Sequence, residues 1–216
     1  MILSQNHLRI LILVNRNTVP ASQLGNKHSF AVQLRSLDTP EHIIDQTKQW
    51  IRDVVVGCNF CPFAANSIKR QSIHYQVETS TIAGVCIESL SKETARLDKD
   101  DTIETIFLIF PNAFASFDDY LDLVLLAEQF LEQNQYEGIY QLASFHPLYR
   151  FARAPEKDAA NYTNRSVYPM LHLLREESID KVLKHYANPE KIPDRNVNFA
   201  REKGLSYMKM LRDACL

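Results

Sequence analysis

The chain has 216 residues, of which 45% are hydrophobic and 23% are charged, as in an ordinary globular protein. A formal net charge of −2 gives no general attraction to nucleic acid. The longest apolar runs, 106–110 and 123–127, are too short to cross a bilayer, and no secretion signal is recognisable at the N-terminus. We therefore expect a soluble, cytoplasmic protein that has neither nucleic acid nor a membrane as its partner.

Residues 1–37 lack a sustained periodicity, and we expect them to be an N-terminal extension that is poorly ordered or loosely docked. The remainder, 38–216, is predicted to be a single α/β domain. Its first element is a helix, because Thr39 suits the N-cap and Pro40 the first helical position. Apolar residues then recur at helical spacing until Gly57, which is placed to stop the helix.

Strands and helices alternate in the rest of the chain. Strands are predicted at 73–79, 102–110 and 139–145, and helices at 85–97, 116–133, 178–186 and 196–215, the last interrupted by Gly204. The second of these strands is nearly continuously apolar, which is typical of a strand buried on both faces. The alternation predicts a compact α/β sandwich with a small, partly parallel sheet and helices packed on it.

Cys58 and Cys61 form a CxxC pair. In redox enzymes this spacing lets one thiolate attack while the other resolves the mixed disulfide. Such a pair usually follows a strand, whereas this one follows a predicted helix, so we interpret the two residues as buried thiols rather than a redox couple. The chain has no second CxxC to complete a zinc knuckle. Four cysteines without a secretion signal do not indicate a disulfide framework.

Two histidines are candidates for a reaction centre. His146 ends a predicted strand, and open α/β sheets bind ligands at strand ends. His172 lies in an apolar run, and if that run is helical, Glu176 shares its face and could set the imidazole tautomer. A thiol beside a histidine makes a nucleophile and a base, so Cys61, His146 and His172 are the candidate catalytic residues. The same three side chains could instead bind zinc or iron, or the histidines could belong to the core.

A glycine-free polar loop supplies candidates for substrate binding. The candidates are Asn161, Asn164 and Arg165 from this loop, together with Arg175. A guanidinium binds carboxylate or phosphate, and residues 139–216 hold 13 Lys and Arg against 9 Asp and Glu, so we expect a small anionic substrate. In a second interpretation, the asparagines only hold an irregular loop in place. Neither a P-loop nor a GxGxxG motif is present, and no particular cofactor is indicated.

Three segments give the chain a resemblance to a known family. They are Gly-Cys-Asn-Phe-Cys-Pro-Phe-Ala at 57–64, Gln-Leu-Ala-Ser-Phe-His-Pro at 141–147, and 161–176 with Asn-Tyr-Thr-Asn-Arg-Ser, Tyr-Pro and Leu-His-Leu-Leu-Arg-Glu. In this order they resemble the signature of the bacterial "domain of unknown function 1415" family, over about residues 47–204. The resemblance implies no activity. It places Cys61 in the signature and Cys58 where a leucine is usual, which further weakens the redox interpretation.

Three functions remain open at this point. The first is an enzyme with one pocket where the candidate catalytic and substrate-binding residues converge. The second is a metal-binding protein that uses Cys61, His146 and His172. The third is a non-enzymatic module that binds a small ligand or a partner. The three signature segments, defined as 57–64, 141–147 and 161–176, are expected to meet in space.

Overall fold

A four-stranded mixed sheet forms the centre of the fold. The computed structural model describes residues 39–184 and 186–216, so the predicted extension at 1–37 lies outside the described residues. The strand order is β1-β2-β4-β3, with β1 and β2 parallel and β4 antiparallel to both of its neighbours. The strands are β1 (Ile73–Val77), β2 (Thr105–Ile109), β3 (Tyr140–Phe145) and β4 (Met170–Arg175). The predicted α/β fold with a partly parallel sheet is confirmed.

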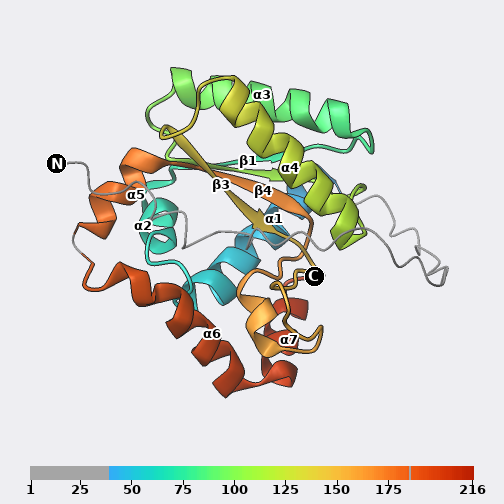
Figure 1. Cartoon of the computed structure of the whole chain (residues 1–216), viewed down its shortest axis with the longest axis vertical. Helices are drawn as coiled ribbons and strands as arrows, with labels where there is room; N and C mark the ends of the chain where they lie inside the picture. Colours follow the sequence, from blue (N-terminus) through green and yellow to red (C-terminus); the bar gives the residue numbers. More distant parts are fainter. Residues whose placement is uncertain (1–38, 185) are drawn as a thin grey trace.

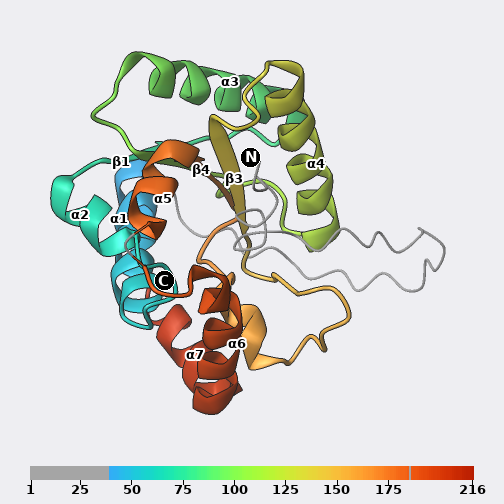
Figure 2. The same cartoon turned by 60° about the vertical axis from the view of Figure 1, so that its left-hand side comes forward.

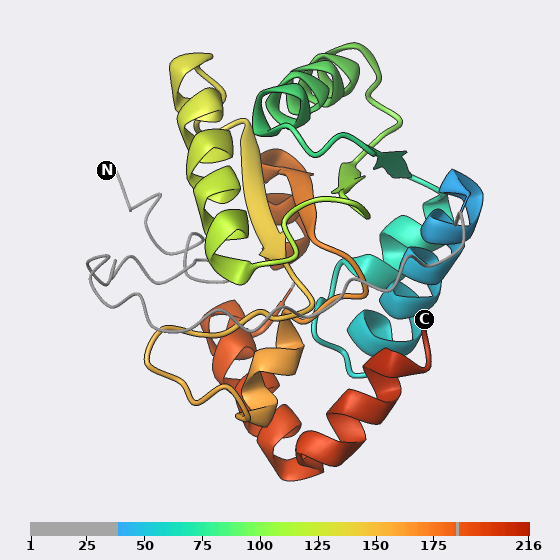
Figure 3. The same ribbon diagram turned by 90° about the vertical axis from the view of Figure 1, so that its right-hand side faces the viewer.

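Helices α3 (Ala83–Lys99) and α4 (Phe117–Gln133) cover one face of the sheet (Figures 1 and 3). The crossover through α3 makes β1 and β2 parallel, because a parallel pair cannot be joined by a tight turn. Ser116 caps α4 by accepting a hydrogen bond from the amide of Asp119, as its sequence pattern predicts. On this side, apolar side chains of both helices pack against the side chains of β2 and β4 that face them.

The opposite face of the sheet carries the helices of both ends of the described chain (Figure 2). These helices are α1 (Pro40–Trp50), the π-helix η2 (Ile51–Val56), α2 (Ala64–Arg70), α5 (Glu176–Leu183), α6 (Ile192–Lys203) and α7 (Leu205–Asp213). Two short 3-10 helices, η3 (Ala159–Thr163) and η4 (Pro189–Lys191), lie in the connections. None of the helices in the described part of the chain is long and apolar enough to cross a membrane.

The first helical segment begins and ends at the residues that the sequence predicts, but the conformation of its C-terminal end is unexpected. Thr39 is the N-cap, and its hydroxyl accepts a hydrogen bond from the amide of His42. The last turns widen into η2, and Gly57 follows with a right-handed φ of −59° instead of a left-handed cap. A Cβ at Gly57 would lie 2.2 Å from the carbonyl oxygen of Asp53, so only glycine fits here.

The apolar run around His172 is a strand and not a helix. It forms β4, which pairs with β2 on one side and β3 on the other. The possible helical pairing of His172 with Glu176 is therefore wrong, because His172 lies in β4 and Glu176 begins α5. In an apolar run this short, the spacing of the hydrophobic residues does not distinguish a buried strand from a buried helix. The pairing partners decide between the two, and they come from distant parts of the chain.

Candidate functional site

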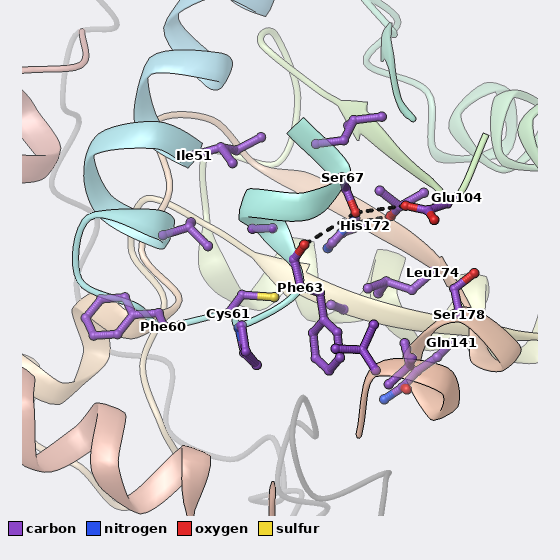
Figure 4. A pocket seen from close by; sticks show the side chains of 18 of the residues that line it. Ile51, Phe60, Cys61, Phe63, Ser67, Glu104, Gln141, His172, Leu174 and Ser178 are labelled. Carbon is purple, nitrogen blue, oxygen red and sulfur yellow. Dashed lines mark hydrogen bonds between the residues drawn. The ribbon is translucent and has the colours of Figure 1, made fainter. Parts of the chain in front are cut away.

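A cavity of about 1120 Å³ lies between the sheet and the helices α1, α2, α5 and α6. This volume is ample for a small organic molecule. Its floor is the sheet, through Ile73, Thr105, Phe107, Gln141, Ala143, Phe145, His172 and Leu174. Figure 4 shows the side chains that surround it, with Cys61 and Phe63 from the loop before α2 facing residues of the sheet and α5.

All three signature segments reach this cavity. Segment 57–64 contributes Phe60, Cys61, Pro62, Phe63 and Ala64; segment 141–147 contributes Gln141, Ala143 and Phe145; segment 161–176 contributes Thr163, Asn164, His172, Leu174 and Arg175. The sheet explains this meeting, because β3 and β4 are neighbours and both turn one side toward the loop before α2. The first segment is far from the other two in the sequence, and all three line the same cavity in the fold.

The loop that carries Cys61 is held by side chains of α6. Asn59 adopts a left-handed backbone conformation with φ of 55°, which turns the chain away from η2. Arg195 donates a hydrogen bond to the carbonyl of Asn59, and the amide of Asn196 donates one to the carbonyl of Phe60 (2.7 Å). Cys61 follows directly, with its sulfur directed into the pocket (Figure 4).

Burial raises the pKa of the Cys61 thiol, and hydrogen bonds from the backbone amides of Phe63 and Ala64 offset only part of this effect. The thiol is therefore protonated at neutral pH. Cys58 is buried and does not line this cavity, and burial raises its pKa as well. All four cysteines are free thiols.

His172 has a defined tautomer. Its Nε2 lies 2.5 Å from Oγ1 of Thr105, and that hydroxyl also donates a hydrogen bond to the carbonyl of Leu173. The threonine has one proton, so both contacts are favourable only if Nε2 carries a proton and donates it to Thr105. Nδ1 then keeps its lone pair. It has no hydrogen-bond partner among the described residues.

Aromatic stacking holds the His172 ring in place. The ring lies parallel to that of Phe107, with centroids 3.9 Å apart, and Phe107 stacks in turn on Tyr75. This row runs across β1, β2 and β4, where the three residues are register partners. Burial lowers the pKa of His172 to about 3, so the imidazole is neutral at neutral pH. The cavity therefore contains a neutral acceptor at Nδ1.

His146 lies outside the cavity lining, with both ring nitrogens used by the backbone. Nε2 donates to the carbonyl of Phe114 (2.7 Å), and Nδ1 accepts from the amide of Leu148 (3.0 Å). The ring is fully buried, and burial lowers its pKa to about 4. These contacts link the end of β3 to the chain before α4.

Asn161 and Arg165 also lie outside the cavity lining and hold the loop between β3 and β4. The amide of Asn161 donates to the carbonyls of Pro155 and Glu156, and its oxygen accepts from the amide of Phe151. The guanidinium of Arg165 donates to the carbonyls of Tyr149 and Glu156. The structure thus brings these two side chains to backbone groups and not to the cavity.

Asn164 and Arg175 do line the cavity. The side-chain oxygen of Asn164 accepts a hydrogen bond from the hydroxyl of Thr163 (2.9 Å). Arg175 donates to the backbone carbonyls of Ile103, Leu97 and Asp100, so its guanidinium is already occupied. Of the seven candidates, Cys61, Asn164, His172 and Arg175 share the cavity, whereas His146, Asn161 and Arg165 do not.

The sequence analysis missed several lining residues. Thr105, which sets the tautomer of His172, comes from a strand predicted only as a buried apolar element. Glu104 lines the cavity and accepts hydrogen bonds from Ser67 (3.1 Å) and Ser72 (2.7 Å), an arrangement partly visible in Figure 4. No local motif marks these residues. Only the register of β2 against β4 would have revealed Thr105.

The alternative metal site finds no support in the arrangement of donors. No group of three or more His, Cys, Asp or Glu side chains is placed to hold a metal within residues 39–184 and 186–216. His146, one of the three proposed ligands, has no ring nitrogen left for a metal. Cys61 and His172 remain as two groups in one cavity.

The comparisons with known proteins agree with the resemblance seen in the signature segments. No curated protein and no solved structure matches the chain. A family model matches most of it, and the matched residues include all three segments that meet at the cavity. The model is described as "Protein of unknown function (DUF1415)" and matches residues 42–210, so the chain belongs to this family.

Proposed function

We propose that the protein is an enzyme that acts on a small organic molecule in the cavity, with Cys61 as the nucleophile and His172 as the proton acceptor. The observation that carries the proposal is that these two residues, from different signature segments, line one cavity. Both are held by contacts with the rest of the fold, because side chains of α6 donate hydrogen bonds to the Cys61 loop and Phe107 stacks on the His172 ring.

The neutral resting states of the two groups mean that the thiol must lose its proton as it reacts. A neutral thiol attacks an activated acyl carbon well only if its proton leaves as the bond to sulfur forms. Nδ1 of His172 takes that proton, and then returns it to the leaving group as the acyl carbon releases it. Water subsequently hydrolyses the thioester and restores the thiol. The transfer leaves an imidazolium beside the oxyanion of the tetrahedral intermediate, and both charges are neutralised when the intermediate collapses and the leaving group departs with the proton.

The proposal is tested with p-nitrophenyl acetate as an acyl donor. Peptide mass mapping should find the acetyl group on Cys61, and p-nitrophenolate should be released in a stoichiometric burst. Cys61→Ser should abolish the burst, whereas Cys58→Ser should retain it because Cys58 does not line the cavity. His172→Gln should slow acetylation by about 10²- to 10⁴-fold, the range typical of a lost general base.

A non-enzymatic ligand-binding module is the second candidate. The observation in its favour is that the burial of Cys61 and His172 leaves no preformed thiolate and imidazolium pair. Equal acetylation of wild-type protein and His172→Gln would favour this candidate and contradict the enzyme. Acetylation of Cys58 instead of Cys61 would contradict the assigned nucleophile.

The location of the protein is part of the same proposal. All four cysteines are free thiols, which supports the cytoplasm as the expected compartment, since its thiols are kept reduced. The sequence also predicted an anionic substrate. The charges around the cavity, described next, support a different substrate class.

A further inference from the structure

We infer that the molecule bound in the cavity is uncharged and largely apolar, and that it donates a hydrogen bond to Nδ1 of His172. The inference deepens the proposed function by naming the substrate class of the same site. It depends on the cavity as the binding site, but it does not depend on Cys61 being a nucleophile.

The apolar character comes from the walls of the cavity. Aromatic rings contribute from the helices, the loops and the sheet: Trp50, Phe60, Phe63, Phe107, Phe145, Tyr149 and Phe151. Aliphatic side chains of η2, β1, β4 and α5 add to this apolar wall, and neutral polar side chains lie between them: Asn66, Ser67, Gln141, Thr163, Asn164, Ser178 and Asn196. Such surfaces gain free energy by covering an apolar molecule and give little to a strongly hydrated one.

The cationic side chains of the lining are already engaged with the protein. Among the described residues that line the cavity, the cations are Arg70, Arg175 and Lys181. Arg70 lies 2.6 Å from Glu104, and Lys181 lies 2.8 Å from Glu177. Arg175 donates to three backbone carbonyls of the chain before β2. An anionic ligand would have to compete with the backbone carbonyls for Arg175, whereas Arg70 and Lys181 are mostly exposed, where water screens their charge.

The acidic side chains of the lining do not favour a cation either. Glu104 accepts hydrogen bonds from Ser67 and Ser72 in addition to its contact with Arg70, and these contacts hold its pKa below the usual value. Glu177 is exposed and paired with Lys181. The other acidic lining residues, Asp101 and Asp194, are exposed, where water screens their charge. The lining thus offers no buried, unpartnered charge of either sign.

His172 then supplies the specific contact. Nε2 donates its proton to the hydroxyl of Thr105, so Nδ1 can only accept a hydrogen bond. The complementary group is a hydroxyl or an N–H on the ligand. An apolar molecule with one such donor satisfies Nδ1 and covers the aromatic wall at the same time.

Three matched probes test the inference by calorimetry and thermal shift: 2-naphthol, 2-methoxynaphthalene and 2-naphthoate. The naphthol has the donor, the methoxy compound lacks it, and naphthoate is anionic. We expect the naphthol to bind about fivefold more tightly than the methoxy compound, because a single neutral hydrogen bond is lost. Naphthoate should bind weakest of the three.

His172→Gln separates the donor contact from general packing. The side-chain amide of the glutamine can still reach Thr105, but the variant has no acceptor at the position of Nδ1. The naphthol should therefore fall to the affinity of the methoxy compound, while the methoxy compound keeps its own affinity. Circular dichroism and thermal unfolding check that the variant is folded.

The outcomes distinguish this inference from the proposed enzyme. Tightest binding of naphthoate, equal binding of naphthol and methoxynaphthalene, or no binding of any probe would overturn the inferred ligand class. Cys58→Ser, whose residue does not line the cavity, should bind the naphthol as the wild type does. If no acetylation occurs but the affinity order holds, the enzyme proposal fails and the ligand class stands.

Discussion

The regions around His146 and His172 differ in how they satisfy the ring nitrogens of a buried imidazole. In the region around His146, defined by His146, Asn161 and Arg165, backbone carbonyls and amides occupy the polar atoms of the side chains. In the cavity, one nitrogen of His172 is occupied by Thr105 and the other has no partner among the described residues. Both histidines have lowered pKa values through burial, so a shifted pKa does not separate a structural histidine from a candidate for chemistry.

The comparison gives a rule for locating the site. A buried polar side chain whose bonds all go to the backbone holds a loop, and removing it leaves carbonyls and amides unpaired. A side chain with a free atom on a cavity can be changed at lower cost to stability, but its loss affects what binds. Substitutions in the two regions should therefore have opposite consequences for stability and for ligand binding.

The largest effect is expected for Arg165→Ala. Arg165 is buried, and its guanidinium donates to two backbone carbonyls and lies 4.8 Å from the ring of Tyr162. Losing two charge-assisted hydrogen bonds should lower the free energy of unfolding by about 4 kcal/mol, measured by urea denaturation. Arg150→Ala is the matched control, since Arg150 is exposed, and should change it by less than about 0.5 kcal/mol. Equal stability of the two variants would contradict a structural role for Arg165.

A slightly smaller loss is expected for His146→Ala. The change leaves the carbonyl of Phe114 and the amide of Leu148 without their partners and opens a void among aromatic rings. The free energy of unfolding should fall by about 3 kcal/mol in the same urea experiment. Binding of 2-naphthol at a temperature where the variant is folded should remain close to wild type. A specific loss of binding without a loss of stability would place His146 in the site after all.

The most selective effect concerns pH, because it is absent at neutral pH and grows as the pH falls. Burial lowers the pKa of His146 to about 4 and that of His172 to about 3, so each binds a proton more readily in the unfolded chain. The stabilisation that each neutral imidazole contributes is fully present above pH 6.5, the ordinary pKa of histidine. It is lost as the pH falls toward the pKa of that histidine in the folded protein. Each histidine adds a slope of about 1.4 kcal/mol per pH unit within that window.

His172→Gln isolates one of these two contributions. At neutral pH it should change the free energy of unfolding by less than about 1 kcal/mol, since the glutamine can still reach Thr105. Between pH 6.5 and 4 its urea midpoints should fall less steeply than those of the wild type, by the share of one histidine. A parallel pH profile for the two proteins would mean that His172 is not desolvated.

Much of the fold was predictable because its signals are local. Thr39 and Ser116 cap the helices that follow them, and the nearly continuous apolar run at 102–110 contains the fully buried β2. Strand β4 was not predicted, since Met170–Arg175 carries no distinguishing period. Its place between β2 and β3 follows from pairing with residues far away in the chain.

The candidate site was predictable in its residue types but not in its geometry. The sequence by itself determined the helix caps, the buried strand and the three signature segments that carry Cys61 and His172. Only the tertiary structure decided that His172 faces the cavity while His146 faces the backbone of the chain before α4. The physical reason is that side chains alternate between the faces of a strand, so their environment depends on register and on what packs against each face. Those contacts join residues far apart in sequence, and no local pattern encodes them.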